Sequence, residues 1–255
     1  MCRLLGSVSS APVTVDEVLG EGREAFLELA CKHGDGWGHA FSEHPEHVEV
    51  HKSPDSAREN PTFAALASGR AARAALTHLR WATLGLGLSH ENTHPFSDGR
   101  IAFAHNGSID PPQSLDRLIS ADLVGRRQGS TDSERYFLAL LSRLAEQDEV
   151  DALVSTLADV TSLPGGAKSL NCMLLTPRAL YAVCSYDPAS YDEPDYYPLL
   201  YRADADTVVV ASTGWTDSTG WTTLDNGQML VVDRETLATS LVAVATPVTA
   251  GAVAR

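Results

Sequence analysis

The chain opens with MCRLLG, Met1 to Gly6, and so places a cysteine directly after the initiator methionine. Methionine is generally removed when the next residue is small, so the mature chain is expected to start at Cys2 with a thiol and a free α-amine on one residue. Because an α-amine titrates near 7.7 to 8.0, far below a lysine, it can accept the thiol proton near neutral pH. The stretch predicts an N-terminal nucleophile, with a chance cysteine as the alternative.

Chemistry at a carbonyl also needs fixed hydrogen-bond donors, and IAFAHNGSI, Ile101 to Ile109, offers a pair at the expected end of a strand. The side-chain amide of Asn106 and the backbone N–H of Gly107 are suited to the negative charge that develops on a carbonyl oxygen under attack. We therefore predict that they form an oxyanion hole. The alternative is a simple Asn-Gly turn.

Two charged residues suit the charged groups of an amino acid substrate. In HLRWAT, Arg80 is expected in the middle of an apolar strand, where an unpaired guanidinium is unfavourable and a bidentate carboxylate is a good partner. In STDSE, Asp132 starts an amphipathic helix, and its carboxylate is a partner for an ammonium group. The alternatives are an internal ion pair for Arg80 and a helix N-cap for Asp132.

The order of the expected elements indicates the fold class. Hydrophobic periodicity predicts a helix over about 14–31, begun by a Thr14–Glu17 capping box, and two more between 130 and about 161. Strands dominate both ends of the chain, and the sequence therefore predicts an α+β fold of two antiparallel sheets with helical layers. The expected strands are GDGWGHAF and VEVHK as a hairpin, LTHLRWA, IAFAHNGSI, SLNCMLLT, ALYAVCSY, TVVVAS and QMLVVD.

Composition limits the partners and the location. The formal net charge of -14 is spread along 255 residues, which argues against nucleic acid. The sequence shows no apolar run of membrane-spanning length and no secretion signal, so we expect a cytoplasmic protein without a membrane partner. The four cysteines lack close paired spacing, which favours reduced thiols. We expect one domain over 2–245 and a loose tail over 246–255.

A histidine-rich segment is the main alternative site, because six potential metal ligands fall within 21 residues. Their spacing fits no standard zinc motif, so we expect no bound metal. Trp215 and Trp221 are expected at the edge of the second sheet, and the acidic, tyrosine-rich stretch 187–198 is expected to be a solvated connection, or else an acceptor interface. The six ligands are Cys31, His33, His39, His44, His47 and His51; Cys31, Cys172 and Cys184 are expected in the core.

It is the combination of motifs that resembles a known family. MCRLLG, GDGWGHAF, HLRWAT, NTHPF, AHNGSI and STDSE, in this order over about residues 2–140, resemble the glutaminase domain of class II glutamine amidotransferases, a branch of the N-terminal nucleophile hydrolases. The resemblance implies a four-layer αββα sandwich of two antiparallel sheets. It also implies hydrolysis of the side-chain amide of glutamine through a γ-glutamyl thioester, with release of ammonia and without a cofactor.

The same resemblance implies roles for individual residues. Cys2 is the nucleophile, and Asn106 and Gly107 form the oxyanion hole. Arg80 binds the substrate carboxylate, and Asp132 binds its α-ammonium. The expected pocket lining is Trp81, Thr83 and the segment Asn92 to Phe96, which includes His94.

The second half of the chain departs from larger family members, because nothing after Thr161 resembles a domain that consumes ammonia. We therefore expect either a separate acceptor or synthase chain, or simple hydrolysis of glutamine or another γ-glutamyl amide by water. The alternative of another class is a non-catalytic glutamine-sensing or regulatory subunit of a partner synthase.

Overall fold

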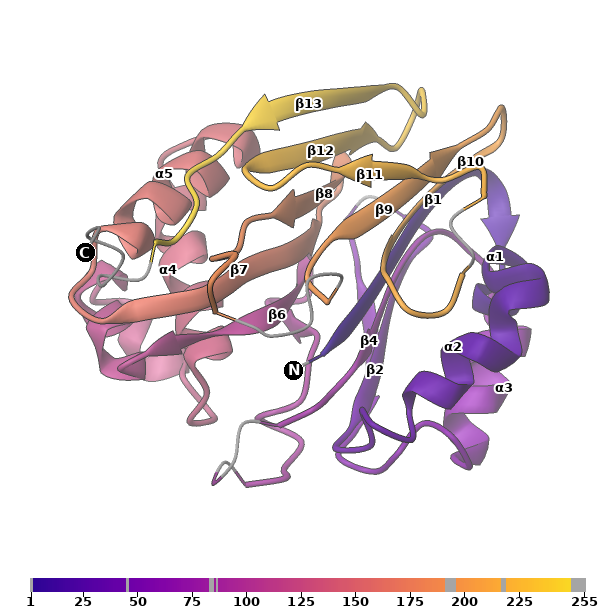
Figure 1. The fold of residues 1–255 in the computed structure, drawn as a ribbon, viewed down its shortest axis with the longest axis horizontal. Coiled ribbons are helices and arrows are strands. Elements are labelled where there is room, and N and C mark those ends of the chain that lie inside the picture. Colours follow the sequence, from indigo (N-terminus) through magenta and orange to yellow (C-terminus); the bar gives the residue numbers. More distant parts are fainter. Residues whose placement is uncertain are drawn as a thin grey trace.

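The computed structural model describes residues 2–44, 46–82, 85, 87–190, 196–216 and 219–248. The strands of these residues form two sheets, and every pairing between them is antiparallel (Figure 1). The first sheet has the order β11 (Thr222–Leu224), β9 (Leu199–Ala203), β10 (Thr207–Ser212), β1 (Arg3–Val13), β4 (Ala72–Leu79), β2 (Trp37–Ser42) and β3 (Glu49–Ser53). The second has the order β13 (Thr239–Ala243), β12 (Gln228–Asp233), β8 (Ala179–Cys184), β7 (Gly166–Leu175), β6 (Ala102–Asp110) and β5 (Phe96–Ser97).

Strand β1 shows why the two sheets stack. Its side chains alternate between two apolar environments, as the pleat of a strand requires. Leu4 and Val8 lie in the core between the sheets, whereas Leu5 lies in the core between the first sheet and its helices. Both faces of the first sheet are therefore covered.

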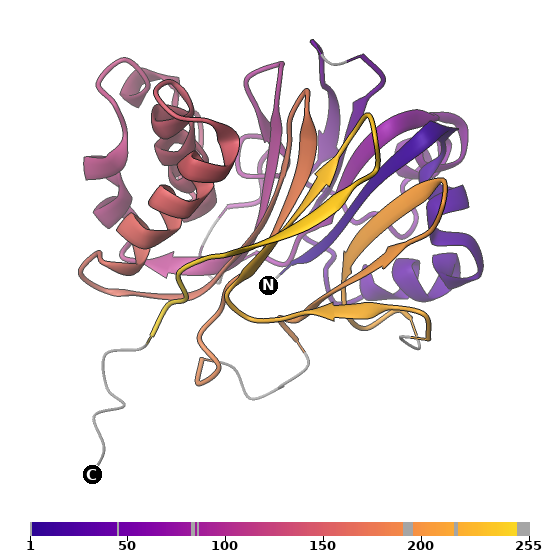
Figure 2. The ribbon, with the colours of Figure 1, turned by 90° about the horizontal axis from the view of Figure 1, so that it is seen from above.

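Helices cover the outer face of each sheet (Figures 1 and 2). On the first sheet, Phe63 of α3 packs against Trp37 of β2, and Phe26 of α2 lies in the same apolar cluster. On the second, Phe137 and Leu157 pack from α4 and α5 into the cluster that contains β6 and β7. The predicted αββα sandwich is confirmed. The helices are α1 (Val15–Leu19), α2 (Arg23–Leu29), α3 (Pro61–Gly69), α4 (Asp132–Leu144) and α5 (Glu149–Thr161), with short 3-10 helices at η1 (Gly20–Gly22), η2 (Pro112–Leu118) and η3 (Val124–Arg126).

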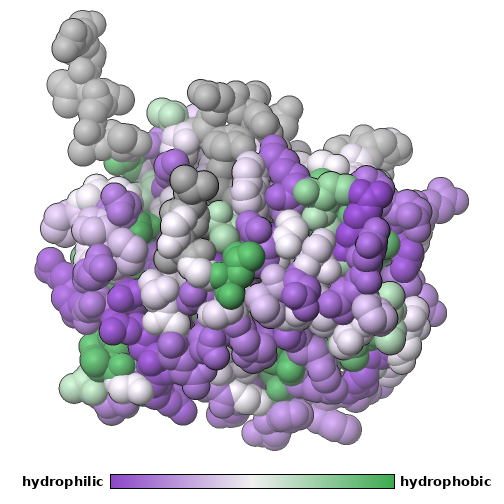
Figure 3. All heavy atoms as spheres, turned by 90° about the horizontal axis from the view of Figure 1, so that it is seen from below, coloured by the Kyte–Doolittle hydropathy of each residue, from purple (hydrophilic) through white to green (hydrophobic). Residues whose placement is uncertain are grey.

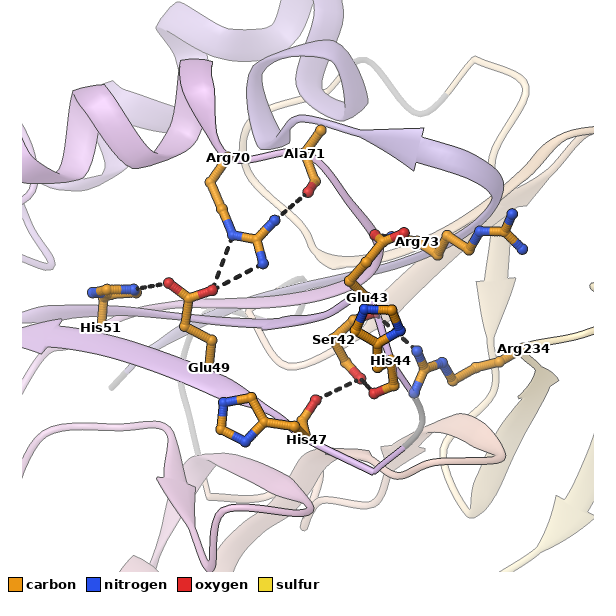
Figure 4. A network of polar contacts seen from close by, with 10 residues as sticks. All are labelled: Ser42, Glu43, His44, His47, Glu49, His51, Arg70, Ala71, Arg73 and Arg234. Atoms are coloured by element: carbon orange, nitrogen blue, oxygen red, sulfur yellow. Dashed lines mark hydrogen bonds and ion pairs between the residues drawn. The ribbon is translucent and has the colours of Figure 1, made fainter.

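Polar contacts link the two sheets at the end of the sandwich away from Cys2 (Figure 4). Arg234, which follows β12, donates to the carbonyl of Thr176 at 2.9 Å and to the carbonyl of Ser42, in β2, at 2.9 Å. Burial lowers the pKa of this guanidinium. Arg234 thus bridges a strand end of the first sheet and a turn of the second.

The expected helix over 14–31 is wrong in its continuity. The capping box of Thr14 and Glu17 is present, but α1 ends at Leu19 and η1 separates it from α2. Glycine is a poor helix former, and Gly20 has a positive φ of 53° that ends the first helix. The strands β9, β11 and β13, and helix α3, were not predicted; three of these four elements are five residues or fewer.

Three smaller expectations are also corrected. Cys31 is exposed, whereas Cys172 and Cys184 are buried as predicted. Trp215 packs against Phe26 and the helices of the first sheet, not at the edge of the second. The stretch 187–198 is not simply solvated, because Asp187, Tyr196 and Tyr197 are buried; its residues 191–195 lie outside the described part of the chain.

The surface is mostly hydrophilic on the face shown in Figure 3, with apolar residues scattered singly. No helix among the described residues is long and apolar enough to cross a membrane. Of the predicted tail over 246–255, only residues 246–248 are described, and they belong to no helix or strand.

Candidate active site

The site is centred on Cys2, which precedes β1 and is 7% exposed. Its backbone nitrogen donates a hydrogen bond to Oδ1 of Asn106 on β6 at 2.9 Å. Strands β1 and β6 belong to different sheets, so the contact lies between the layers of the sandwich. The bond also fixes the orientation of the Asn106 amide, because a backbone N–H must meet the amide oxygen and not its nitrogen.

The other end of that amide is a buried donor. Nδ2 of Asn106 has no hydrogen-bond partner among the described residues, although the side chain is fully buried. A buried donor without a partner is unfavourable unless something else satisfies it. The arrangement therefore provides a fixed, desolvated N–H donor beside Cys2, which is what a developing oxyanion requires.

Asn106 and Gly107 do not form a turn, which corrects both the alternative and the expectation that they end a strand. They lie inside β6, which continues to Asp110 and pairs with β7. A side chain at Gly107 would meet the carbonyl oxygen of Ser169 and the ring of His105. Glycine is required here by close packing of two strands and not by turn geometry.

The environment of Cys2 favours the protonated thiol. Burial raises the pKa of the thiol, which lies 3.8 Å from the carbonyl oxygen of Trp81, whereas the positive charge of Arg80 lowers this pKa. Asp132 acts on the same thiol and raises its pKa further. A buried neutral thiol needs a base before it can act as a nucleophile.

Arg80 is 3% exposed and lies immediately after β4, not in the middle of a strand as expected. The turn that begins GDGWG holds it. Nη1 of Arg80 donates to the carbonyl of Asp35 at 3.2 Å, and the Asp35 carboxylate accepts from the backbone N–H of Ala82 at 2.8 Å. The guanidinium thus contacts a carbonyl and forms no ion pair with a described acidic residue within 4.0 Å, which leaves it suited to an incoming carboxylate.

Asp132 is the first residue of α4 and is 7% exposed. The N-cap is Thr131, whose side chain accepts from the N–H of Glu134, so the N-cap alternative for Asp132 is wrong. One oxygen of Asp132 accepts from the N–H of Ile109 on β6 at 2.7 Å. This bond ties the start of α4 to the strand that carries Asn106.

Pocket residues expected from the resemblance are partly assembled. His94 is 3% exposed, and its ring lies 4.2 Å from the ring of His78, between centroids. Asn92 accepts from the N–H of Ser130 at 2.8 Å and so joins two loops near the start of α4. Trp81 contacts Cys2 through its carbonyl. Thr83 lies outside the described residues.

The histidine-rich segment uses its side chains in other ways. Among the described residues, no group of three or more His, Cys, Asp or Glu side chains is placed to hold a metal ion. His39 is buried against Thr77, and His51 contacts Glu49, which also pairs with Arg70 (Figure 4). A cavity of about 700 Å³ between α4, Arg100 and Arg178 contains none of the residues at Cys2.

The sequence analysis did not predict two residues that connect elements around the site, His105 and Tyr196. His105, inside the HNG motif, lies between the hydroxyl of Ser133 at 2.9 Å and the carbonyl of Ser169 at 3.0 Å, and so joins β6 to α4 and β7. The guanidinium of Arg3 lies 4.0 Å from the ring centroid of Tyr196, and the hydroxyl of Tyr196 contacts His33 at 3.1 Å. His105 could have been found in the sequence because it directly precedes Asn106. The contact of Tyr196 with Arg3, at the other end of the chain, could not.

Comparison with known proteins identifies a family. Residues 1–192 match the family described as "Glutamine amidotransferases class-II". A protein of Mycolicibacterium smegmatis named gamma-glutamyl-hercynylcysteine sulfoxide hydrolase is 28% identical over 240 residues, which cover 91% of this chain and 96% of that protein.

Two solved structures share the fold. A glutamine aminotransferase class-II domain protein from Silicibacter pomeroyi has a TM-score of 0.70 at 22% identity, over 96% of this chain and 100% of that one. The glutamine phosphoribosylpyrophosphate amidotransferase of B. subtilis has a TM-score of 0.61 at 20% identity, over 94% of this chain and 49% of that one.

The αββα sandwich, with a cysteine at the start of its first strand held against a buried asparagine, defines an enzyme of the N-terminal nucleophile type. The family match covers most of the chain. The protein belongs to the class II glutamine amidotransferases.

Proposed function

We propose that this enzyme hydrolyses the side-chain amide of glutamine, or of another γ-glutamyl amide, through a thioester on Cys2. The observation that supports it most is the state of Asn106, whose Oδ1 holds the nitrogen of Cys2 at 2.9 Å while its buried Nδ2 has no partner among the described residues. One amide thus positions the nucleophile and presents a donor for the oxyanion.

Removal of Met1 would turn the nitrogen of Cys2 into a free amine. In its neutral form this amine takes the thiol proton, directly or through water, and the sulfur attacks the side-chain carbonyl carbon of the substrate. The carbonyl electron pair moves to oxygen, which Nδ2 of Asn106 and the N–H of Gly107 stabilise. As the oxyanion collapses, the C–N bond breaks and the new ammonium group donates its proton to the leaving amine. A γ-glutamyl thioester and free ammonia, or an amine, result.

The second half of the reaction regenerates the enzyme. The α-amine takes a proton from water, the resulting hydroxide attacks the thioester carbonyl, and the C–S bond breaks to give glutamate and the thiolate. The thiolate then recovers the proton from the ammonium. Every step uses groups of Cys2, Asn106 and Gly107 together with water, so this mechanism needs no cofactor.

Arg80 and Asp132 give the proposal its substrate class. The guanidinium of Arg80 is suited to the α-carboxylate, and the carboxylate of Asp132 to the α-ammonium, of a γ-glutamyl group. Both charges act on the Cys2 thiol, so both residues lie near the proposed nucleophile. The Mycolicibacterium smegmatis relative is named for hydrolysis of a γ-glutamyl compound, which supports the hydrolytic outcome. An acceptor for released ammonia would be a separate chain, and residues 2–245 would act as one glutaminase domain.

The test measures turnover and the covalent intermediate together. Purified protein, with loss of Met1 verified by intact mass, is incubated with glutamine and with a panel of γ-glutamyl amines while glutamate and the released amine are followed. We expect turnover of at least one substrate, a γ-glutamyl adduct on Cys2 after acid quench, and loss of both in Cys2→Ala. Cys31→Ala is the matched control, because Cys31 is exposed and has no role here.

Two other results would decide against hydrolysis by Cys2. Turnover that persists in Cys2→Ala, or that is carried by protein retaining Met1, refutes the proposal. Tight binding of glutamine without turnover by the Met1-free protein supports the alternative of a glutamine-sensing subunit.

A further inference from the structure

Three residues lie side by side across three strands of the first sheet, and the last of them is two residues before Arg80 in the chain. Gly38 on β2 pairs with Lys52 on β3 and with His78 on β4. Paired residues of neighbouring antiparallel strands project from the same face of a sheet. We call Lys52, Gly38 and His78 the cross-strand row.

The segment Thr93 to Phe96 crosses this row and contacts each of its members. The ring of His94 lies 4.2 Å from the ring of His78. A side chain at Gly38 would collide with the carbonyl of His94 and the ring of Pro95. Backbone and ring therefore both rest directly on the sheet.

Lys52 completes the contact with hydrogen bonds to the backbone of the segment. Its Nζ donates to the carbonyl of Thr93 at 2.7 Å and lies 3.4 Å from the carbonyl of Pro95, on either side of His94. The ammonium also lies 5.3 Å from the ring centroid of Phe96. One cation thus binds three of the four residues of the segment.

Hydrogen bonds from described residues do not hold the ring of His94 in place. Neither ring nitrogen has a hydrogen-bond partner among the described residues, and the side chain is 3% exposed. Its position therefore depends on the backbone on either side of it and on ring contacts with His78 and Phe96. Lys52 donates to this backbone on both sides of His94, in addition to the bond from the N–H of Thr93 to the carbonyl of His90 and the pairing of Phe96 with Phe103.

We propose that Lys52 is a positioning residue that seats His94 in the wall of the substrate pocket, with Gly38 leaving the space for it. This inference rests on the proposed function, because it assigns Lys52 an effect on the same reaction. Lys52 touches neither Cys2 nor the donors at Asn106. Its loss is therefore expected to weaken substrate capture and to leave the chemical step largely intact.

The charge on Lys52 gives the proposal a second readout. Burial lowers the pKa of Lys52 to about 8, although the carboxylates of Glu134 and Glu91 act in the opposite direction. The groups facing it are these two carboxylates, Asp98 and Arg126 across a shared cavity of about 370 Å³, and the neutral ring of His94. The ammonium loses its proton as pH rises through 8, and a neutral amine is a weaker donor to the two carbonyls.

The experiment compares Lys52→Met and Lys52→Arg with the wild type and with Lys168→Met, an exposed lysine on β7 that serves as the control. KM and kcat for the preferred γ-glutamyl amide are measured from pH 6.5 to 9.5. Since hydrogen bonds from a charged donor are involved, we expect Lys52→Met to raise KM about 10- to 100-fold at pH 7 with kcat within a few fold. Wild-type KM should rise more steeply above pH 8 than KM of Lys52→Arg, whose guanidinium remains charged, because deprotonation of the substrate ammonium affects both enzymes equally.

The possible failures are separable. An active wild type with unchanged KM in a folded Lys52→Met refutes the seating role, as does an alkaline rise in KM that is as steep in Lys52→Arg as in the wild type. If Lys52→Met does not fold, the pH profile of Lys52→Arg still decides. An inactive wild type refutes the proposed function instead, and the dissociation constant of glutamine in the two variants then tests the seat alone.

Discussion

Cys2 and Asn106 are joined across 104 residues by a 2.9 Å hydrogen bond from the backbone nitrogen of Cys2 to Oδ1 of Asn106. Strands from two different sheets meet at this bond, so the orientation of the nucleophile depends on the register of the whole sandwich. The same nitrogen would become the catalytic amine once Met1 is removed. Asn106 would then orient the base and stabilise the oxyanion with its two ends.

The first prediction follows from that double use. Asn106→Ala removes the buried donor, and we expect kcat to fall about 100- to 1,000-fold, since this is the effect of losing one oxyanion donor. The measurement is single-turnover formation of the thioester. Asn106→Asp keeps an oxygen for the nitrogen of Cys2 but has no N–H, so it should be equally slow. An Asn106→Asp variant with wild-type rates would remove the donor from the mechanism.

Arg80 gives a prediction about binding. Its guanidinium contacts only the carbonyl of Asp35 among described acceptors, so Arg80→Ala should mainly remove a partner for the substrate carboxylate. We expect KM to rise about 10- to 100-fold with a smaller change in kcat, because the interaction is present in both ground and transition states. A substrate without the α-carboxylate, 4-aminobutanamide, should be turned over equally by Arg80→Ala and the wild type. Arg58→Ala is the control, because Arg58 is an exposed arginine that forms an ion pair with Glu28.

Much of this site is visible in the sequence, because its parts are local. Cys2, Asn106 and Asp132 each carry their chemistry in the residue type, and Thr14 with Glu17 fixes a helix start within four residues. Alternation of apolar residues likewise predicts β6, β7 and β8. These signals need no knowledge of distant contacts.

The remaining parts depend on register and could not be predicted. Lys52 and His78 become neighbours of Gly38 only when three strands align, and a shift of one residue would place them on the other face. Arg80 was expected inside a strand because the apolar pattern runs through it, but β4 ends at Leu79. The backbone of Arg80 instead forms hydrogen bonds with the GDGWG turn. Tyr196 reaches Arg3 from 193 residues away.

Buried histidines make the fold sensitive to acid. Burial lowers the pKa of His33 to about 4 and of His39 to about 3, and holds those of His78 and His94 well below the ordinary value. The folded state therefore binds fewer protons than the unfolded state below pH 6.5. Stability is fully present above that pH and is lost as pH falls toward the folded-state values.

The expected slope is large. Each neutral imidazole costs about 1.4 kcal/mol per pH unit once the unfolded form is protonated, so four together remove roughly 5.6 kcal/mol per unit from a total of about 5–15 kcal/mol. Urea unfolding from pH 8 to 5 should show this decline. His39→Gln should flatten it by one group, whereas the exposed His90→Gln should not. A stability that is constant down to pH 5 would contradict the burial of these rings as neutral groups.

The last prediction concerns Gly107, whose missing side chain lets β6 approach the carbonyl of Ser169 on β7. Gly107→Ala forces that carbonyl or the ring of His105 to move, and overpacking of this kind costs about 1–3 kcal/mol. Because His105 also contacts Ser133 at the start of α4, the shift should reach Asp132 and raise KM as well as lower the melting temperature. Gly69→Ala at the end of α3 has open space around its Cβ and is the matched control. Equal melting temperatures for the two variants would show that the strands yield at Gly107 without cost.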